Sequence, residues 1–170
     1  MPNETTPNGA PPLLERKLAT ILSADGAGYS HMRGVNEERT VQVFRGHREI
    51  LDTLVKLHRG RIFNTAGDAV LAEFNSAVEA VRCATEIQAA LRTRNEHLAS
   101  DEKMLFRIGI NLGDVIVQVG DLLGDGVNIA SRIEPLAGAG GICVSMDVER
   151  QIRNALEARF EKLAPTELKN

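Results

Sequence analysis

The order of apolar patterns along the chain constrains the fold more than any other feature of the sequence. An apolar run over residues 18–25 has the length of a buried strand. Residues 36–58 then repeat apolar side chains at helical spacing, with Asn36 as a candidate N-cap and Gly60 as a stop signal. Residues 61–74 follow as two short strands around a glycine-containing turn. The first half therefore predicts a strand, a long amphipathic helix and a hairpin.

The middle of the chain predicts a second helix followed by more strands. Ser76 and Glu79 have the spacing of a capping box, which marks the N-terminus of a helix. Residues 105–119 carry apolar side chains in strand-like runs that are interrupted at Gly113-Asp114. We therefore expect two strands here, with a break between them.

The last part of the chain completes an α+β pattern. Residues 124–136 predict a third helix, residues 142–145 another strand, and residues around Val148 and Ile152 a short final helix. Because helical crossovers are mixed with hairpins, we expect a ferredoxin-like α+β sandwich, with a mostly antiparallel sheet and helices packed on one face. The sequence contains no internal repeat, coiled-coil pattern or Walker-type loop.

Length, composition and charge limit the class of protein. A chain of 170 residues with 43% hydrophobic content suffices for one domain, which we place at residues 16–170 after a polar leader or linker, residues 1–15, expected to be disordered. A net charge of −3 without a basic run argues against a nucleic-acid partner. Because no apolar stretch is long enough for a membrane span, we expect no membrane partner and a cytoplasmic location. Cys83 and Cys143 are expected to be reduced core thiols.

Two aspartates at predicted strand termini are candidate metal ligands. Asp25 ends the first strand beside Gly26, and Asp68 follows Gly67 in the hairpin turn. Adjacent strands can bring both carboxylates to one sheet edge, where they could hold Mg²⁺ together with water and phosphate oxygens. Taken alone, each aspartate is as readily explained as a solvated strand end or an ordinary turn residue.

A second candidate group lies on the third predicted helix. Asn128 and Arg132 are four residues apart and so share one helix face, while Val127, Ile129 and Ile133 are expected to turn toward the core. An amide and a guanidinium suit a sugar oxygen and a phosphate whose charge grows during reaction. The alternative is a polar pair on the exposed face of an amphipathic helix.

Taken together, four stretches of this sequence resemble the catalytic domain of class III adenylyl and guanylyl cyclases, particularly the bacterial members. The resemblance runs from about residue 16 to the C-terminus, with the motifs in the same order. The four stretches are Leu18-Ala-Thr-Ile-Leu-Ser-Ala-Asp25-Gly-Ala-Gly-Tyr-Ser30, Gly60-Arg-Ile-Phe-Asn-Thr-Ala-Gly-Asp68, Arg107-Ile-Gly-Ile-Asn-Leu-Gly113 and Gly124-Asp-Gly-Val-Asn-Ile-Ala-Ser-Arg132.

The resemblance implies a lyase for intracellular signal transduction that converts ATP to 3′,5′-cyclic AMP and pyrophosphate with two Mg²⁺ or Mn²⁺ ions. It identifies Asp25 and Asp68 as the metal-binding carboxylates, with the Gly26 carbonyl as a further ligand. It also implies that the backbone of one segment holds the triphosphate. That segment is Gly28-Tyr29-Ser30.

The resemblance further implies a homodimer whose two active sites each combine residues of both subunits. The partner would contribute Asn128 to orient the ribose and Arg132 to stabilise the phosphate under attack. Lys169 matches a lysine that binds the terminal phosphates. Because members of the family continue through another strand beyond this point, we expect a domain without its last strand from a longer parent chain, with a regulatory or repeat region.

The residues that would recognise the base depart from the usual family pattern. Asp121 matches the aspartate that accepts a hydrogen bond from the adenine amine, but Asn64 stands where adenylyl members usually carry lysine. An uncharged amide donates a weaker hydrogen bond, so we expect a raised KM or a lower rate for ATP. A guanylyl cyclase and a catalytically silent, nucleotide-sensing dimerisation module remain alternatives. A diguanylate cyclase is disfavoured because its Gly-Gly-acidic-acidic-Phe motif is absent.

Overall fold

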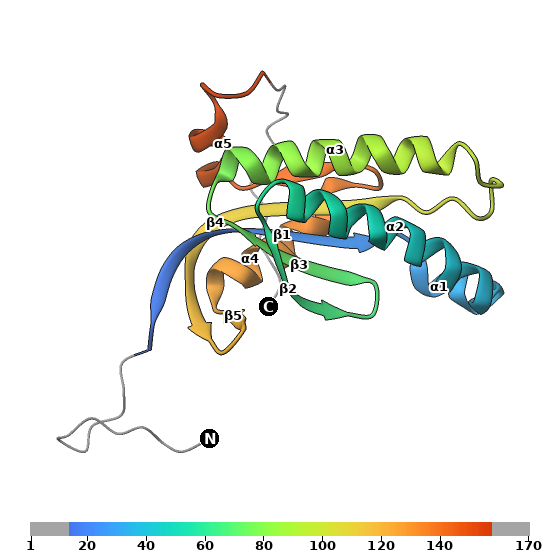
Figure 1. Cartoon of the computed structure of the whole chain (residues 1–170), viewed down its shortest axis with the longest axis horizontal. Helices are drawn as coiled ribbons and strands as arrows, with labels where there is room; N and C mark the ends of the chain where they lie inside the picture. The colour runs from blue at the N-terminus through green and yellow to red at the C-terminus, as the bar shows by residue number, and fades with distance from the viewer. Residues whose placement is uncertain (1–13, 158–170) are drawn as a thin grey trace, which may run out of the picture.

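The computed structural model describes residues 14–157, which form a six-stranded sheet, five α-helices and one 3₁₀ turn (Figure 1). In chain order the elements are β1 (Arg16–Gly26), α1 (Tyr29–Val35), α2 (Glu37–Leu57), β2 (Arg61–Ala66), β3 (Ala69–Phe74), α3 (Ala77–Asn95), β4 (Phe106–Gln118), β5 (Asp121–Leu123), α4 (Asp125–Ile133), the 3₁₀ turn η1 (Glu134–Ala137), β6 (Ile142–Val144) and α5 (Met146–Ile152).

The sheet has the strand order β2-β3-β1-β4-β5, and β6 pairs with β4 outside this path. The β1–β3, β1–β4, β2–β3 and β4–β5 pairs are antiparallel, whereas β6 runs parallel to β4. The two longest strands, β1 and β4, pair over their whole common length, from Arg16 opposite Ile116 to Gly26 opposite Phe106. The prediction of an α+β fold with a mostly antiparallel sheet is therefore confirmed.

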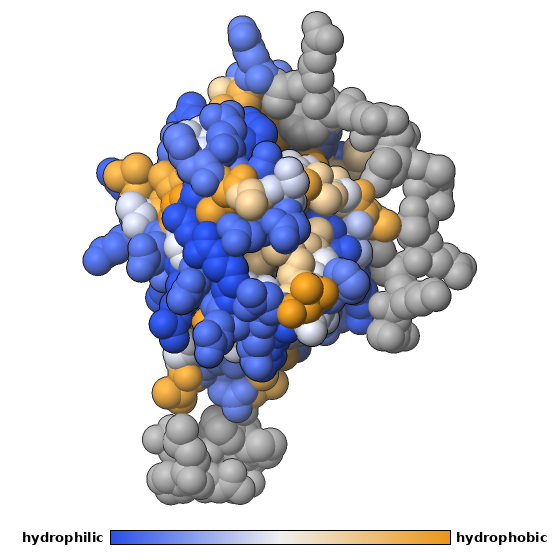
Figure 2. Space-filling model, turned by 90° about the vertical axis from the view of Figure 1, so that its right-hand side faces the viewer, coloured by the Kyte–Doolittle hydropathy of each residue, from blue (hydrophilic) through white to orange (hydrophobic). Residues whose placement is uncertain are grey.

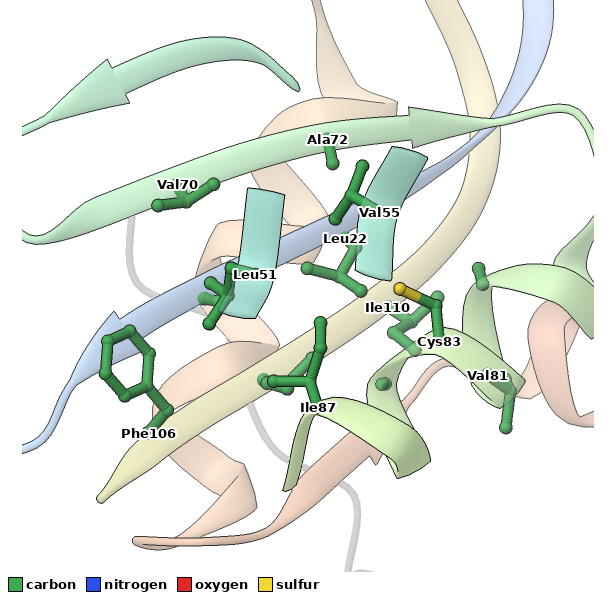
Figure 3. Close-up of a cluster of buried hydrophobic side chains, with 14 of the residues drawn as sticks. Leu22, Leu51, Val55, Val70, Ala72, Val81, Cys83, Ile87, Phe106 and Ile110 are labelled. Carbon is green, nitrogen blue, oxygen red and sulfur yellow. The ribbon is translucent and has the colours of Figure 1, made fainter. Parts of the chain in front are cut away.

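The main core lies between the sheet and the two long helices α2 and α3, which cover the same face (Figure 1). Side chains from both helices meet the strands there, and Figure 3 shows Leu51 and Val55 of α2 beside Leu22 of β1. Asn36 caps α2 as predicted, because its side chain accepts a hydrogen bond from the Arg39 amide. Fully burying a side chain such as Leu22 or Leu51 stabilises the fold by roughly 1.5–3 kcal/mol.

The opposite face of the sheet carries a smaller core beneath α4. Successive residues of a strand point to opposite faces, so Leu22 belongs to the main core while the adjacent Ile21 packs with Val127 and Ala130 of α4. The two long helices share one face as expected, but α4 departs from the prediction of helices on one face, because it lies on the other. Phe63 and Leu71 of β2 and β3 extend this second cluster and are only partly buried.

The predicted break in residues 105–119 is wrong, because β4 is one continuous strand of 13 residues. Gly113 does not interrupt the strand but pairs with Ala19 of β1. A Cβ atom at Gly113 would lie 3.1 Å from the Cα atom of Gly126 in α4. The glycine therefore permits close packing of a helix on the strand, which local sequence cannot distinguish from a turn.

Other local predictions differ from the structure in detail. The left-handed residue after α2 is Arg59, with φ 62°, and not Gly60. Gly60 is instead required by packing, because a Cβ atom there would lie 2.6 Å from the Phe74 ring. Ser76 caps α3 through the Glu79 amide, but the Glu79 side chain contacts His58 rather than closing a capping box. The helix α1 and the short strand β5 were not predicted.

Within residues 14–157, no helix combines the length and the apolar character needed to cross a membrane. Most of the expected leader, residues 1–13, and the C-terminal residues 158–170 with Lys169 lie outside the described residues.

Candidate active site

The two candidate metal aspartates meet at one end of the sheet, and we refer to Asp25 and Asp68 together as the acidic edge. Asp25 is the penultimate residue of β1, while Asp68 lies in the turn that joins β2 to β3. Because β3 pairs antiparallel with β1, this turn lies beside the end of β1. The Gly26 amide donates a hydrogen bond of 3.1 Å to Oδ2 of Asp68. The structure therefore brings together the two carboxylates that the sequence separates by 43 positions.

The acidic edge is partly shielded from solvent. Figure 2 views the molecule from the end at which β1 finishes and shows a mostly hydrophilic surface with smaller apolar patches. Burial raises the pKa of Asp68, and the nearby carboxylate of Asp25 raises it further, while hydrogen bonds from backbone amides and the charge of Arg107 oppose the shift. A cation is stabilising beside a carboxylate whose charge is disfavoured by burial and by a second carboxylate.

Two further residues of this site, Arg107 and Glu134, were not singled out from the sequence. Arg107 lies directly opposite Asp25 on the adjacent strand β4. Its Nε and one terminal nitrogen each lie 3.1 Å from Oδ1 of Asp25, and the same terminal nitrogen lies 3.3 Å from Oδ2. Arg107 is the first residue of the third sequence motif, but the sequence does not indicate its partner, because the contact with Asp25 depends on the register of β1 and β4.

Glu134 adds a third carboxyl group to the surroundings of Asp25. It follows directly after α4 and is only 3% exposed. Its Oε2 atom lies 3.7 Å from Nε of Arg107 and has no hydrogen-bond partner among residues 14–157. Burial holds the pKa of Glu134 well above its usual range; the adjacent Asp25 raises the pKa further, and Arg107 opposes the shift. The only signal in the sequence was an acidic residue at the end of an otherwise apolar helix face.

The donors at the acidic edge fit a hard divalent cation that also binds phosphate. Within residues 14–157 no group of three or more His, Cys, Asp or Glu side chains has the arrangement of a complete metal site. Mg²⁺ commonly binds proteins through one or two carboxylates and completes its coordination with water and substrate phosphate oxygens. Asp25 and Asp68 therefore fit such an ion when a polyphosphate supplies the remaining ligands.

The predicted triphosphate segment follows immediately after the acidic edge. Gly28 has a φ of 74° and forms the N-cap of α1, which begins at Tyr29. The Tyr29 ring packs against Phe44 of α2, with ring centroids 5.2 Å apart, so its side chain is held by the core. Ser30 is exposed. The segment thus presents backbone rather than a charged side chain beside the two aspartates.

Asn128 and Arg132 lie on α4, as predicted, but form no hydrogen bond or ion pair with the acidic edge among the described residues. Asn128 is exposed and Arg132 is half-buried, and neither side chain is hydrogen-bonded to another residue in the described part of the chain. Val127 and Ile133 are buried as expected, whereas Ile129 is only partly buried. Within residues 14–157, α4 therefore carries an exposed amide and a half-buried guanidinium without polar partners.

The two candidate base-reading residues lie on β2 and β5, the strands at the two ends of the strand order. Asn64 is an exposed residue of β2 that pairs with Leu71 of β3. A bulge shifts the register of this strand pair between Ile62 and Asn64. Asp121 begins β5, where its Oδ1 accepts a hydrogen bond of 2.8 Å from the Leu122 amide.

Arg61 ties these two segments together, because it lies on β2 and donates a hydrogen bond of 3.1 Å to the carbonyl of Gly120 in the β4–β5 turn. The edge of β2 that carries Asn64 is therefore attached to the turn that precedes Asp121.

The fold and these groups define a class of nucleotide-processing enzyme: an α+β domain with paired carboxylates at one strand end and an amide and guanidinium on a separate helix. The model of the adenylate and guanylate cyclase catalytic domain matches residues 16–170. The chain belongs to this family, and the resemblance found in its motifs is confirmed.

Individual relatives agree with this assignment. A Rhizobium meliloti (strain 1021) protein named "Putative adenylate cyclase 3" is 41% identical over 92% of this chain, which spans 27% of that protein. The crystal structure of an adenylate/guanylate cyclase/hydrolase from Silicibacter pomeroyi is 39% identical, with a TM-score of 0.86 over 93% of this chain and 92% of that chain. The structure of the guanylyl cyclase Cya2 is 27% identical, with a TM-score of 0.79 over 92% of this chain and 89% of that chain. The chain thus spans well under half of the curated relative.

Proposed function

We propose that the chain is an adenylyl cyclase domain that converts ATP to 3′,5′-cyclic AMP and pyrophosphate in a signalling pathway. The observation that carries this proposal is the meeting of Asp25 and Asp68 at one strand end, joined through the Gly26 amide. The carboxylate of Asp121, on the β5 side of the same sheet, supports adenine as the base. Because ATP is the substrate that we assign, we expect the domain to act in the cytoplasm.

Asp25 and Asp68, with the Gly26 carbonyl, would hold two Mg²⁺ or Mn²⁺ ions. Such an ion pair would help to activate the ribose 3′-hydroxyl and to stabilise charge on the departing pyrophosphate. The chain's own contribution is to fix both carboxylates at one place: the Gly26 amide orients Asp68, and Arg107 orients Asp25. The backbone of Gly28 and the following residues would then bind the triphosphate, since it adjoins this edge.

The groups that act on the sugar and on the reacting phosphate would come from a second copy of the chain. Asn128 would orient the ribose, and Arg132 would stabilise the phosphate as its negative charge grows. Both lie on α4 without a polar partner among the described residues, which supports a role at a surface shared by two protomers. Lys169 would contribute to binding of the terminal phosphates.

Base recognition would depend on Asp121 and Asn64. One Asp121 oxygen accepts the Leu122 amide, which fixes the carboxylate so that the other oxygen can accept from the adenine amine. The Asn64 amide would donate to adenine N1, more weakly than a lysine would. Guanine would place its carbonyl oxygen against the Asp121 carboxylate, which disfavours GTP.

A guanylyl cyclase is the second candidate, because Asn64 lacks the positive charge that favours adenine and because a structurally similar protein is a guanylyl cyclase. A silent nucleotide-sensing module is less well supported, since such a module has little need for two closely placed carboxylates. Incubating the purified chain with ATP or GTP and either Mg²⁺ or Mn²⁺, followed by identification of the cyclic product, separates these functions. Cyclic AMP from ATP supports our proposal, predominant cyclic GMP refutes the choice of base, and no turnover by a verified dimer refutes catalysis.

The shared site can be tested by mixing two inactive variants. Asp25→Ala removes a metal ligand, and Arg132→Ala should lower turnover by about 10²–10³-fold, as expected for one transition-state donor. A mixed dimer of the two variants contains one intact site and should have about half of the native activity, so a random equal mixture, in which about half of the dimers are mixed, should recover about a quarter. Mixed dimers that form but remain inactive would show that the residues are assigned to the wrong subunits.

A further inference from the structure

We propose that Glu134 is a positioning residue that controls the availability of Asp25 for a divalent cation, and that it acts through Arg107. The inference rests on the proposed function, because it concerns the metal-binding role of Asp25. It adds a residue to that site from the end of α4 and assigns it a task distinct from metal binding.

Arg107 and a divalent cation would compete for the oxygens of Asp25. The guanidinium of Arg107 contacts both carboxylate oxygens, at 3.1 and 3.3 Å. A cation that binds Asp25 needs at least one of these oxygens. Arg107 must then give up part of its hydrogen bonding, and a buried or half-buried guanidinium without an acceptor is costly.

Glu134 offers Arg107 an alternative hydrogen-bond acceptor. Oε2 of Glu134 is buried, lies 3.7 Å from Nε of Arg107 and has no hydrogen-bond partner in the part of the chain that the structure describes. That separation becomes a hydrogen bond after a small movement of the guanidinium. A carboxyl group retains an oxygen able to accept from Nε in either protonation state, so the role does not depend on the charge of Glu134.

The backbone of Glu134 is itself held in place by close packing. Its backbone packs on Gly109 of β4 so closely that a Cβ atom at Gly109 would lie 2.7 Å from both the Cα and N atoms of Glu134. Pro135 follows and restricts the start of the η1 turn. An acceptor on this fixed backbone can bind the Arg107 guanidinium when a cation takes an oxygen of Asp25.

A matched pair of substitutions tests this inference by Mn²⁺ binding to the purified chain, followed as free Mn²⁺ by electron paramagnetic resonance. Glu134→Gln keeps an acceptor oxygen and should bind Mn²⁺ with nearly native affinity. Glu134→Met has a similar length without an acceptor and should bind roughly tenfold more weakly, as expected for one lost hydrogen bond to a charged group. Glu149→Gln, in an ion pair with Arg153 on α5, serves as a control and should change nothing.

The pattern of the two variants decides the outcome. If Met and Gln weaken binding equally, Glu134 acts by its charge and the inference is wrong. If neither weakens it, Glu134 has no influence on the cation. Thermal unfolding of each variant shows whether a loss of binding reflects a loss of folded protein.

A double-mutant cycle with Arg107→Met keeps the inference distinguishable from the proposed function. The unfolding midpoints of Glu134→Met, Arg107→Met and the double variant should show that the two substitutions are coupled rather than additive. Additive effects would refute the contact, whatever the metal does. Conversely, if Asp25→Ala binds Mn²⁺ as the native chain does, the assignment of Asp25 as a metal ligand is wrong. The double-mutant cycle then still shows whether Glu134 interacts with Arg107.

Discussion

Replacing Gly109 by alanine should test how closely α4 must approach β4. A Cβ atom at Gly109 would lie 2.6 Å from the carbonyl oxygen of Ala130 and 2.7 Å from the N and Cα atoms of Glu134. All three are backbone atoms, so no side-chain rotation relieves the overlap, and the end of α4 must move by several tenths of an ångström. Overpacking of this kind costs about 1–3 kcal/mol, which lowers the midpoint of thermal unfolding by roughly 2–12 °C for a chain of this size.

The same displacement should also lower activity, because Arg132 and Glu134 lie in the segment that moves. A misplacement of 1 Å can cost about 10²-fold in rate. Gly34→Ala is the matched control: Gly34 lies in α1 and has nothing within 4 Å of its Cβ position. Alanine there should raise helix stability by about 0.5–1 kcal/mol. Thermal and urea unfolding with cyclase assays measure both variants, and a Gly109→Ala protein as stable and active as the native chain would refute the reasoning.

Three further predictions concern pH and base choice. Burial lowers the pKa of His47, so the stability contributed by the neutral imidazole should be complete above about pH 6.5 and fall with acidification. His47→Gln should lose less stability than the native chain between pH 7.5 and pH 5, as measured by urea titrations at the two values. Burial opposes the charge on His58, but hydrogen bonds to Glu86 and Glu79 raise its pKa overall. His58→Gln should therefore lower the unfolding midpoint more at pH 6 than at pH 9, because the native contribution disappears as the pH rises through the raised pKa; an equal loss at both values contradicts this. Asn64→Lys should lower the KM for ATP about fivefold by replacing a neutral donor with a charged one, and an unchanged ratio of ATP to GTP turnover would argue against Asn64 reading the base.

The sequence predicted most elements because their signals are local. The apolar repeat of α2, the Asn36 cap and the turn before Asp68 depend on neighbouring residues, and each appears in the structure. These features need no knowledge of distant parts of the chain. The meeting of Asp25 and Asp68 was foreseen only as something that adjacent strands could allow, and it depends on the pairing of β1 with β3 rather than with the next strand, β2.

The contacts of Arg107 and Glu134 could not be read in the same way. The pairing of Arg107 with Asp25 depends on the register of β1 and β4. These strands are 80 residues apart and are not joined to each other by a hairpin turn, which would set their alignment. Glu134 reaches this pair only because α4 lies on the second face of the sheet, and sequence periodicity gives no information about which face a helix covers. The missing signals are therefore those of tertiary packing.

Two glycines of β4, one of which was wrongly predicted to break the strand, show how α4 is positioned. Gly109 and Gly113 lie four residues apart on β4 and so face the same side, at a separation of about 13 Å for an extended strand. Gly126 and Glu134 are eight residues apart around α4, a rise of about 12 Å along a helix. The two spacings match, so α4 contacts the strand at both ends, at Gly113 through Gly126 and at Gly109 through Glu134. Two glycines four residues apart in one strand can therefore indicate a place where a short helix packs closely on that strand. These two contacts fix the position of α4, and so of its polar face, along β4.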